Sequence, residues 1–200
     1  MIELKFGNSK LPTTTMVYDM GTSRDCPSKA LGLCKVVNEY GENGCYAAGP
    51  EKFRPNCLPC RERKQEYWLT NSAKDIYQDI DKQLKRKRTK TKLFRFNEVG
   101  DFWGKACVDK LSYIAAWLKI DHKVITYGYS ARADLDFNNV EFKVKSSGWD
   151  NGNNGRTVVV HKDNKKRIDE LLAIGYKICP GNCKVCALCA GPGNIIFIKH

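Results

Sequence analysis

Apolar residues recur at helical spacing in three segments of the chain. The segment SAKDIYQDIDKQLKRK places Ser72 as an N-cap ahead of an apolar stripe. The stripe consists of Ala73, Ile76, Tyr77, Ile80 and Leu84. Asp101 is in position to cap a second helix through WGKACVDKLSYIAAWLK. Asn164 is in position to cap a third helix, NKKRIDELLAI, and Gly175 ends that helix. The pattern therefore predicts three helices after residue 61.

Short runs of β-branched and aromatic residues separate these helices. They are TTTMVYDM at 13–20, KLFRFNE at 92–98, HKVITYGYS at 122–130, VEFKVKS at 140–146, RTVVVHK at 156–162 and IIFIKH at 195–200. Strands that alternate with helices or short connections predict an α/β protein with a parallel sheet. The loop lengths favour a partial, open β/α barrel over eight closed units. We expect one domain over 1–200, with 1–60 as a cysteine-rich wrap and 61–200 as β/α units ending in a cysteine loop and a final strand.

The chain is strongly basic, with 34 Lys and Arg against 22 Asp and Glu, a formal charge of +12. The run KQLKRKRTKTK at 82–92 has seven basic residues and no acid. Lys85–Lys92 could attract nucleic acid through its phosphates, or the run could be a solvated helix end. No aromatic residue interrupts it, which favours the solvated helix end. The sequence shows neither a secretory signal nor a long apolar segment, so we expect a cytoplasmic protein that does not associate with membranes.

Ten cysteines in such a chain indicate metal ligands more than disulfides. Cys107 falls on the apolar face of a predicted helix and is expected in the core. The close spacing of Cys179, Cys183, Cys186 and Cys189 allows one loop to hold a single centre. Cysteine-only sites select zinc or iron–sulfur clusters, and close runs beside a proline are commoner around a 4Fe–4S cluster. We therefore expect an iron–sulfur cluster, with zinc and then disulfides as alternatives.

A second set of cysteines lies near the N-terminus. It comprises Cys26, Cys34, Cys45, Cys57 and Cys60. The two sets could fill two four-ligand sites, or one site that draws on both ends of the chain. The sequence leaves the number of clusters, one or two, open.

Polar residues follow several of the predicted strands. In parallel α/β folds, ligands bind at the carboxyl ends of the strands, and we expect the cysteine loop after residue 178 to join that rim. Asn97, Asp101 and Arg132 are the candidates for substrate binding, with the arginine as a fork for carboxylate or phosphate. Motifs for NTP hydrolysis, acyl transfer and zinc-protease chemistry are absent.

Several segments together resemble one known family. These are DCPSKALGLC with GCYAAG, LFRFNEVGDFWGKACVDKLSYIAAWLK, VITYGYSAR and ICPGNCKVCALC. In this order they are similar to the phage-encoded gene product 88 family. The resemblance implies an iron–sulfur cluster and a partial barrel like that of radical S-adenosylmethionine proteins, in the cytoplasm of an infected host cell.

The chain departs from the radical enzymes in one respect. Their CxxxCxxC motif follows the first strand, whereas here that spacing occurs near the C-terminus, at Cys179, Cys183 and Cys186. Cys189 is available as a fourth ligand, and a fully ligated cluster has no open iron for S-adenosylmethionine.

Two functions of different classes follow. The first is an iron–sulfur phage protein that performs redox or radical-type chemistry on a small molecule. The alternative is a zinc-stabilised module that binds nucleic acid or a host protein, without catalysis.

Overall fold

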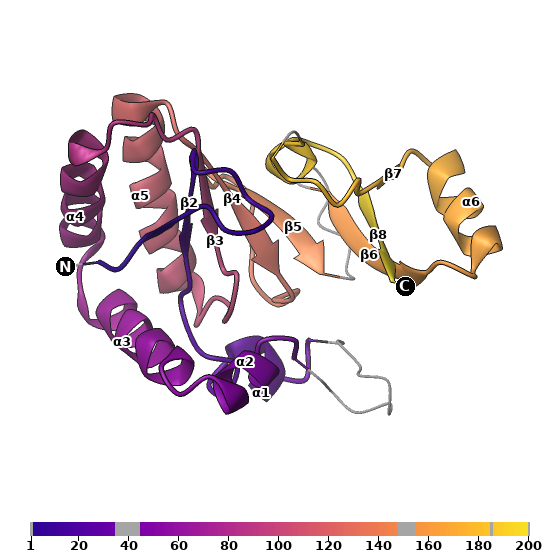
Figure 1. The fold of residues 1–200 in the computed structure, drawn as a ribbon, viewed down its shortest axis with the longest axis horizontal. Helices are drawn as coiled ribbons and strands as arrows, with labels where there is room; N and C mark the ends of the chain where they lie inside the picture. Colours follow the sequence, from indigo (N-terminus) through magenta and orange to yellow (C-terminus); the bar gives the residue numbers. More distant parts are fainter. Residues whose placement is uncertain (1, 35–44, 148–154, 185, 200) are drawn as a thin grey trace.

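The computed structural model describes residues 2–34, 45–147, 155–184 and 186–199. The described strands form one sheet in the order β1-β2-β3-β4-β5-β6-β8-β7 (Figure 1). Their bounds are β1 Lys5–Phe6, β2 Thr15–Tyr18, β3 Leu93–Phe96, β4 Ile125–Ser130, β5 Lys143–Ser147, β6 Arg156–His161, β7 Lys177–Ile178 and β8 Ile195–Lys199. β1 is antiparallel to β2, and every other described pair is parallel. The predicted α/β class is confirmed, with an open, mostly parallel sheet; the partial barrel stays a prediction.

The described α-helices lie between β2 and β3, between β3 and β4, and between β6 and β7. They are α1 Pro27–Ala30, α2 Ala48–Phe53, α3 Cys57–Thr70, α4 Ala73–Arg86, α5 Lys105–His122 and α6 Lys165–Ala173, with a 3-10 turn, η2, at Leu188–Ala190. Ser72 and Asn164 cap α4 and α6, each accepting a hydrogen bond from a backbone N–H, as predicted. Among the described residues, none of the helices combines the length and apolar character needed to cross a lipid bilayer.

The main core lies between the sheet and the pair α4 and α5, which run side by side in Figure 1. Phe94 and Phe96 of β3 are buried against these helices. Side chains alternate across a strand, so Leu93 and Arg95 point to the opposite, inner face. A smaller core joins α6 to β6 and β8 on the same side of the sheet as α4 and α5. No described helix covers the inner face, where Val159 of β6 remains 69% exposed.

One expectation about a helix boundary changes. α5 begins at Lys105 with Gly104 as its N-cap, so Asp101 is not the cap residue. Asp101 is instead buried, with both carboxylate oxygens bound to neighbouring segments. Residue 60, the expected end of the cysteine-rich wrap, lies in α3, which begins at Cys57; the division of the chain there stays a prediction.

Candidate metal centre

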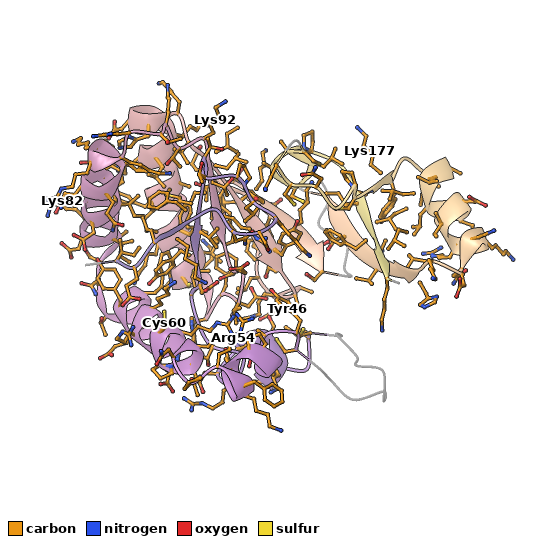
Figure 2. The ribbon with its side chains drawn as sticks, viewed as in Figure 1. Tyr46, Arg54, Cys60, Lys82, Lys92 and Lys177 are labelled. Atoms are coloured by element: carbon orange, nitrogen blue, oxygen red, sulfur yellow. The ribbon has the colours of Figure 1, made fainter. Side chains whose placement is uncertain are left out.

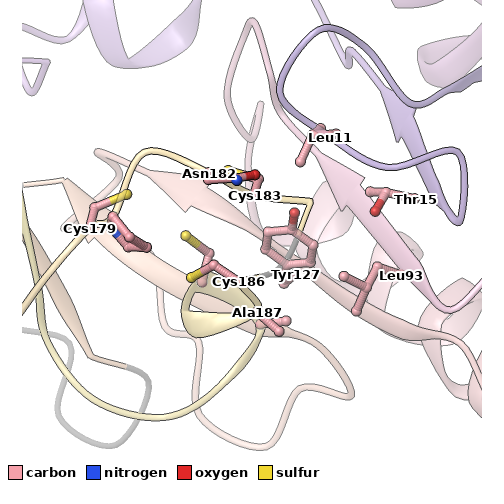
Figure 3. Close-up of a pocket in the computed structure, with 12 residues that line it drawn as sticks. Leu11, Thr15, Leu93, Tyr127, Cys179, Asn182, Cys183, Cys186 and Ala187 are labelled. Atoms are coloured by element: carbon pink, nitrogen blue, oxygen red, sulfur yellow. The ribbon is translucent and has the colours of Figure 1, made fainter.

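The loop between β7 and β8 brings its four cysteines to one place. Cys179, Cys183, Cys186 and Cys189 all line a single cavity (Figure 3). The opposite wall is formed by the inner face of the sheet and includes Tyr127. The cavity encloses about 20 Å³, which is room for about one water molecule. The sequence-based grouping of these four thiols therefore corresponds to a common cavity.

The loop lies at a different edge of the sheet from the one expected. Thr15 and Leu93, which face it, are the first residues of β2 and β3, so the loop covers the amino ends of these strands. The carboxyl rim lies at the opposite edge, beside α1 and α2 (Figure 1). The reason is the register of β7, which is short and pairs Lys177 with Ile195 at the start of β8. The chain therefore enters the loop near the beginning of β8.

The loop has no hydrophobic core of its own. Between Lys177 and Asn194, no described residue is buried. One backbone hydrogen bond, from the N–H of Cys179 to the carbonyl oxygen of Ile196, fixes its start at 2.8 Å. Apolar burial thus contributes little to the order of this segment.

Burial and neighbouring thiols affect the acidity of the cysteines. Burial raises the pKa of Cys183, and the nearby Cys179 thiol adds to the rise. Burial also raises the pKa of Cys189, while a hydrogen bond from the Tyr129 hydroxyl opposes the rise. Burial raises the pKa of Tyr127 to about 12. Burial also raises the pKa of Tyr129, so both tyrosines remain neutral beside the thiols at neutral pH.

Two cations with little solvent exposure lie behind the thiols on the inner face. The half-buried Arg95 guanidinium is 5.5 Å from the centre of the Tyr129 ring. Lys145 is 0% exposed, and its Nζ donates to the carbonyl oxygen of Gly193 over 2.6 Å. The positive charge of Arg95 acts against the raised pKa values of the Cys183 and Cys189 thiols. Such charges stabilise thiolates.

The thiols line one cavity but do not form a ready coordination shell. Within the described ranges, no three side chains of His, Cys, Asp or Glu are placed so that they could hold a metal ion. No disulfide joins any of the ten cysteines. The donor chemistry fits a soft metal or an iron–sulfur cluster. The loop must therefore rearrange to hold such a group.

The N-terminal cysteines lie elsewhere. Cys26 caps α1, where burial raises its pKa to about 11 and backbone N–H groups of Lys29 and Ser28 oppose the rise. Cys34 is close enough to add to that rise. The structure places the segment that carries Cys26 and Cys34 at the carboxyl rim, away from the C-terminal loop (Figure 1).

Within the described residues, no three of the N-terminal cysteines are placed so that they could hold a metal ion. Cys57 and Cys60 belong to the first turn of α3, and Cys45 precedes α2. The Cys60 thiol is 3.4 Å from the Glu3 carboxylate. Figure 2 shows Cys60 on α3, apart from the C-terminal loop. In the described part of the chain, Cys60 and the segment of Cys26 and Cys34 therefore lie apart from the C-terminal loop.

Asp101 organises the carboxyl rim. Its Oδ1 accepts hydrogen bonds from the Ser130 hydroxyl at 2.7 Å and the Phe102 N–H at 2.8 Å. Its Oδ2 accepts from the Ser28 hydroxyl at 2.5 Å and the Ala131 N–H at 2.8 Å. Burial raises the pKa of Asp101, and these four donors oppose the rise. The carboxylate thus joins α1, β4 and the segment before α5.

Arg132 and Asn97 differ in how their polar groups are used. The Arg132 guanidinium donates twice to the Asp134 carboxylate, at 2.7 Å each, and also to the carbonyl oxygen of Phe102. Asn97 is 5% exposed and adopts a left-handed backbone with φ of 52°. Within the described residues, neither polar atom of its side-chain amide has a hydrogen-bond partner. Of the three predicted substrate residues, Asn97 is the one whose buried side-chain amide has no hydrogen-bond partner among the described residues.

The inner-face residues around the thiols were not predicted from the sequence. Arg95 is in register with Tyr127, and Tyr129 with Lys145, so these side chains share the inner face. The alternation within the predicted strands contained this signal. It became informative only once the cysteine loop was located over that face.

These features define an α/β protein with an open, mostly parallel sheet that carries a four-cysteine loop on its inner face. The chain belongs to the gene product 88 family, whose model matches residues 2–140. No curated protein and no solved structure matches the chain. The resemblance inferred from the sequence is thus confirmed at the level of the family.

The matched segment contains one of the two cysteine sets. It includes Cys26–Cys60 together with Asn97, Asp101 and Arg132. It ends before β5 and before the loop of Cys179–Cys189. The description of the family, gene product 88, states neither an activity nor a cofactor.

Proposed function

We propose that this protein binds an iron–sulfur cluster through the thiolates of Cys179, Cys183, Cys186 and Cys189. The observation that carries the proposal is that all four thiols line one cavity on the inner face of the sheet. A set of four thiolates from one short loop is typical of a 4Fe–4S cluster. Zinc is the alternative, because it also accepts four thiolates.

The surroundings of the loop fit such a group. Thiolate ligands bring negative charge, and the cations Arg95 and Lys145 lie behind them. Tyr127 and Tyr129 are largely buried on the same face and limit the access of water. A bound cluster would supply one-electron redox chemistry.

The loop is suited to folding around its ligand. It contains no buried residue between Lys177 and Asn194 among those described, so metal binding contributes the free energy that burial does not. Two or three residues separate successive cysteines of the loop, so bringing their thiols to one centre costs little chain entropy. With Cys189 as the fourth ligand, the cluster has no open iron for S-adenosylmethionine. The proposal is therefore a redox role of a phage protein.

The rim at the opposite edge of the sheet is a second part of the proposal. Asn97 has an unpartnered amide among the described residues and can both donate to and accept from a small ligand. Asp101 and Arg132 hold this rim in shape through their internal hydrogen bonds. We place the substrate, a small polar molecule, at Asn97.

The test is anaerobic purification followed by counts of iron and acid-labile sulfide, with visible absorbance. We expect a brown protein whose iron and absorbance are lost in Cys183→Ser and in Cys186→Ser. Cys107→Ser is the matched control and keeps both, because Cys107 lies in the core between helices. A colourless protein with stoichiometric zinc, or unchanged iron in both loop variants, would overturn the proposal.

A further variant decides whether a second centre exists. Cys57→Ser removes a thiol of the N-terminal set and leaves the C-terminal loop intact. An unchanged iron count in this variant shows that Cys57 holds no iron. A partial loss assigns a second cluster to the N-terminal set.

A further inference from the structure

A basic pocket lies where α4 and α5 both end. It encloses about 270 Å³. Its walls include the side chains of Lys87, Arg88, Lys90 and Lys123. Lys82 on α4 and Lys92 beyond its end extend the positive surface (Figure 2). This pocket collects much of the charge of the run at 82–92.

The positive charge of the pocket is only partly neutralised from within. Its acidic member, Asp121, accepts a hydrogen bond from the Tyr77 hydroxyl. His122 pairs with Asp81 over 2.9 Å. In the described part of the chain, neither Arg88 nor Lys90 has an ion-pair partner, and both side chains are exposed. The pocket therefore attracts anions.

One wall of the pocket carries an unused hydroxyl. Thr91 is 5% exposed, and its Oγ1 has no hydrogen-bond partner among the described residues. Lys87 beside it is held in place, since its Nζ donates to the carbonyl oxygen of Thr13 over 2.6 Å and lies 3.9 Å from the centre of the Phe6 ring. A fixed cation and an unsatisfied hydroxyl match an oxygen-rich anion such as a phosphate.

A row of aromatic rings leads away from the pocket along α5. The Tyr77 and Trp117 ring centres are 5.9 Å apart, and those of Trp117 and Tyr113 are 6.1 Å apart. Trp117 is 40% exposed and Tyr113 is 43% exposed. The Tyr77 hydroxyl reaches Asp121 at the edge of the pocket, so the row and the pocket are continuous.

We propose that the basic pocket and the aromatic row form a binding surface for single-stranded nucleic acid. Phosphates bind in the pocket, at Arg88, Lys90 and Thr91, and bases stack on Trp117 and Tyr113. Basic grooves beside exposed rings are the common means of binding single strands, because every base presents a π-face. A helix rises 1.5 Å per residue, so Trp117 and Asp121 are separated by roughly 6 Å along α5. Neighbouring parts of one strand can therefore reach both.

Charge and rings together favour this ligand over other polyanions. A duplex keeps its bases stacked within the helix and leaves the rings without partners. An acidic polypeptide offers carboxylates to the pocket but has no bases for the row. The surface contains no cysteine, so the inference goes beyond the proposed cluster and does not depend on it.

The test measures the fluorescence anisotropy of a labelled oligothymidylate with the full chain. The double variant Arg88→Ala with Lys90→Ala should bind the oligonucleotide more weakly. A plot of log affinity against log salt concentration should also become shallower, by roughly 0.7 for each phosphate that the variant no longer neutralises. Trp117→Ala should weaken binding about tenfold at unchanged salt slope.

Lys165→Ala with Lys166→Ala is the charge-matched control on α6, at the other end of the molecule (Figure 1). It should leave affinity within about twofold of the parent protein.

Three outcomes would overturn the proposal. Equal weakening by the α6 control would show that net charge alone attracts the strand. An unaffected affinity in Trp117→Ala would remove the aromatic row from the site. Binding of duplex or of polyglutamate as tight as that of oligothymidylate would assign the surface to another ligand. Circular dichroism of each variant confirms that the fold is retained, and Trp117→Phe, which keeps a ring, should recover most of the affinity.

Discussion

The indole Nε1 of Trp68 donates a hydrogen bond to the Sγ of Cys107 over 3.0 Å. Trp68 is 1% exposed and Cys107 is 7% exposed, so the bond joins α3 to α5 inside the core. The Sγ also lies 3.9 Å from the Sδ of Met20. The expectation that Cys107 is a core residue is confirmed.

This bond predicts how two substitutions of Cys107 differ. Cys107→Ala leaves the Trp68 N–H without an acceptor, and we expect it to lower the free energy of unfolding by about 2 kcal/mol. Cys107→Ser keeps an acceptor and should lower it by about 1 kcal/mol. Urea unfolding measures both. Equal losses would show that the bond itself contributes nothing.

We expect a large loss of stability when Asp101 is replaced by Asn, a side chain of nearly equal size. In Asp101→Asn, an amide N–H₂ replaces one oxygen and faces N–H or O–H donors that it cannot satisfy. We expect the free energy of unfolding to fall by about 3 kcal/mol. Asp134→Asn is the control, because Asp134 is the half-exposed partner of Arg132 and should cost less than about 1 kcal/mol. Urea unfolding of the two variants provides the measurement, and a similar loss in both would contradict the central role of Asp101.

We expect Glu51 to make the stability of the protein depend on pH in the acidic range. Burial favours its neutral form, but hydrogen bonds from Ser23 and Arg61 outweigh burial and hold the pKa of Glu51 below its ordinary value of 4.5. Ionised Glu51 therefore contributes stability above that ordinary value, and the contribution is lost as the pH falls through the lower, folded-state pKa.

Glu51→Gln tests this dependence. At pH 7 the variant should lose about 3 kcal/mol, because the buried Arg61 keeps its charge without the ion pair. Denaturant unfolding at several pH values below 5 should show a smaller decline for the variant than for the parent protein. Parallel curves would show that Glu51 is not among the groups responsible.

We expect removal of the metal to reduce protection from hydrogen exchange only locally. If the thiolates of Cys179–Cys189 hold a cluster, a chelator under oxidising conditions should raise amide hydrogen exchange in 179–194. α5 should keep its protection, because its buried face packs in the main core. Mass spectrometry of exchanged peptides separates the two segments. Exchange that is fast in 179–194 before metal removal, and unchanged by it, would contradict a structural role of the metal.

Local patterns in the sequence determined the class of fold. The apolar alternation of KLFRFNE and HKVITYGYS specified β3 and β4, because one face of each strand must be buried against helices. Ser72 and Asn164 specified two helix starts, since a capping side chain bonds to a backbone N–H only a few residues away. Cysteine spacing likewise predicted that Cys179–Cys189 would line one cavity, because a short loop limits how far its thiols can separate.

Tertiary structure decided what lies across from each of these segments. The register of β7 against β8 placed the cysteine loop over the amino ends of β2 and β3, and that register depends on long-range strand pairing. Asp101 became a buried acceptor because α1 and β4 bring donors to it from distant parts of the chain. The rings of α5 meet the basic run only because α4 packs beside α5. Pairings between residues far apart in the sequence leave no local pattern, so they appear only once the chain is folded.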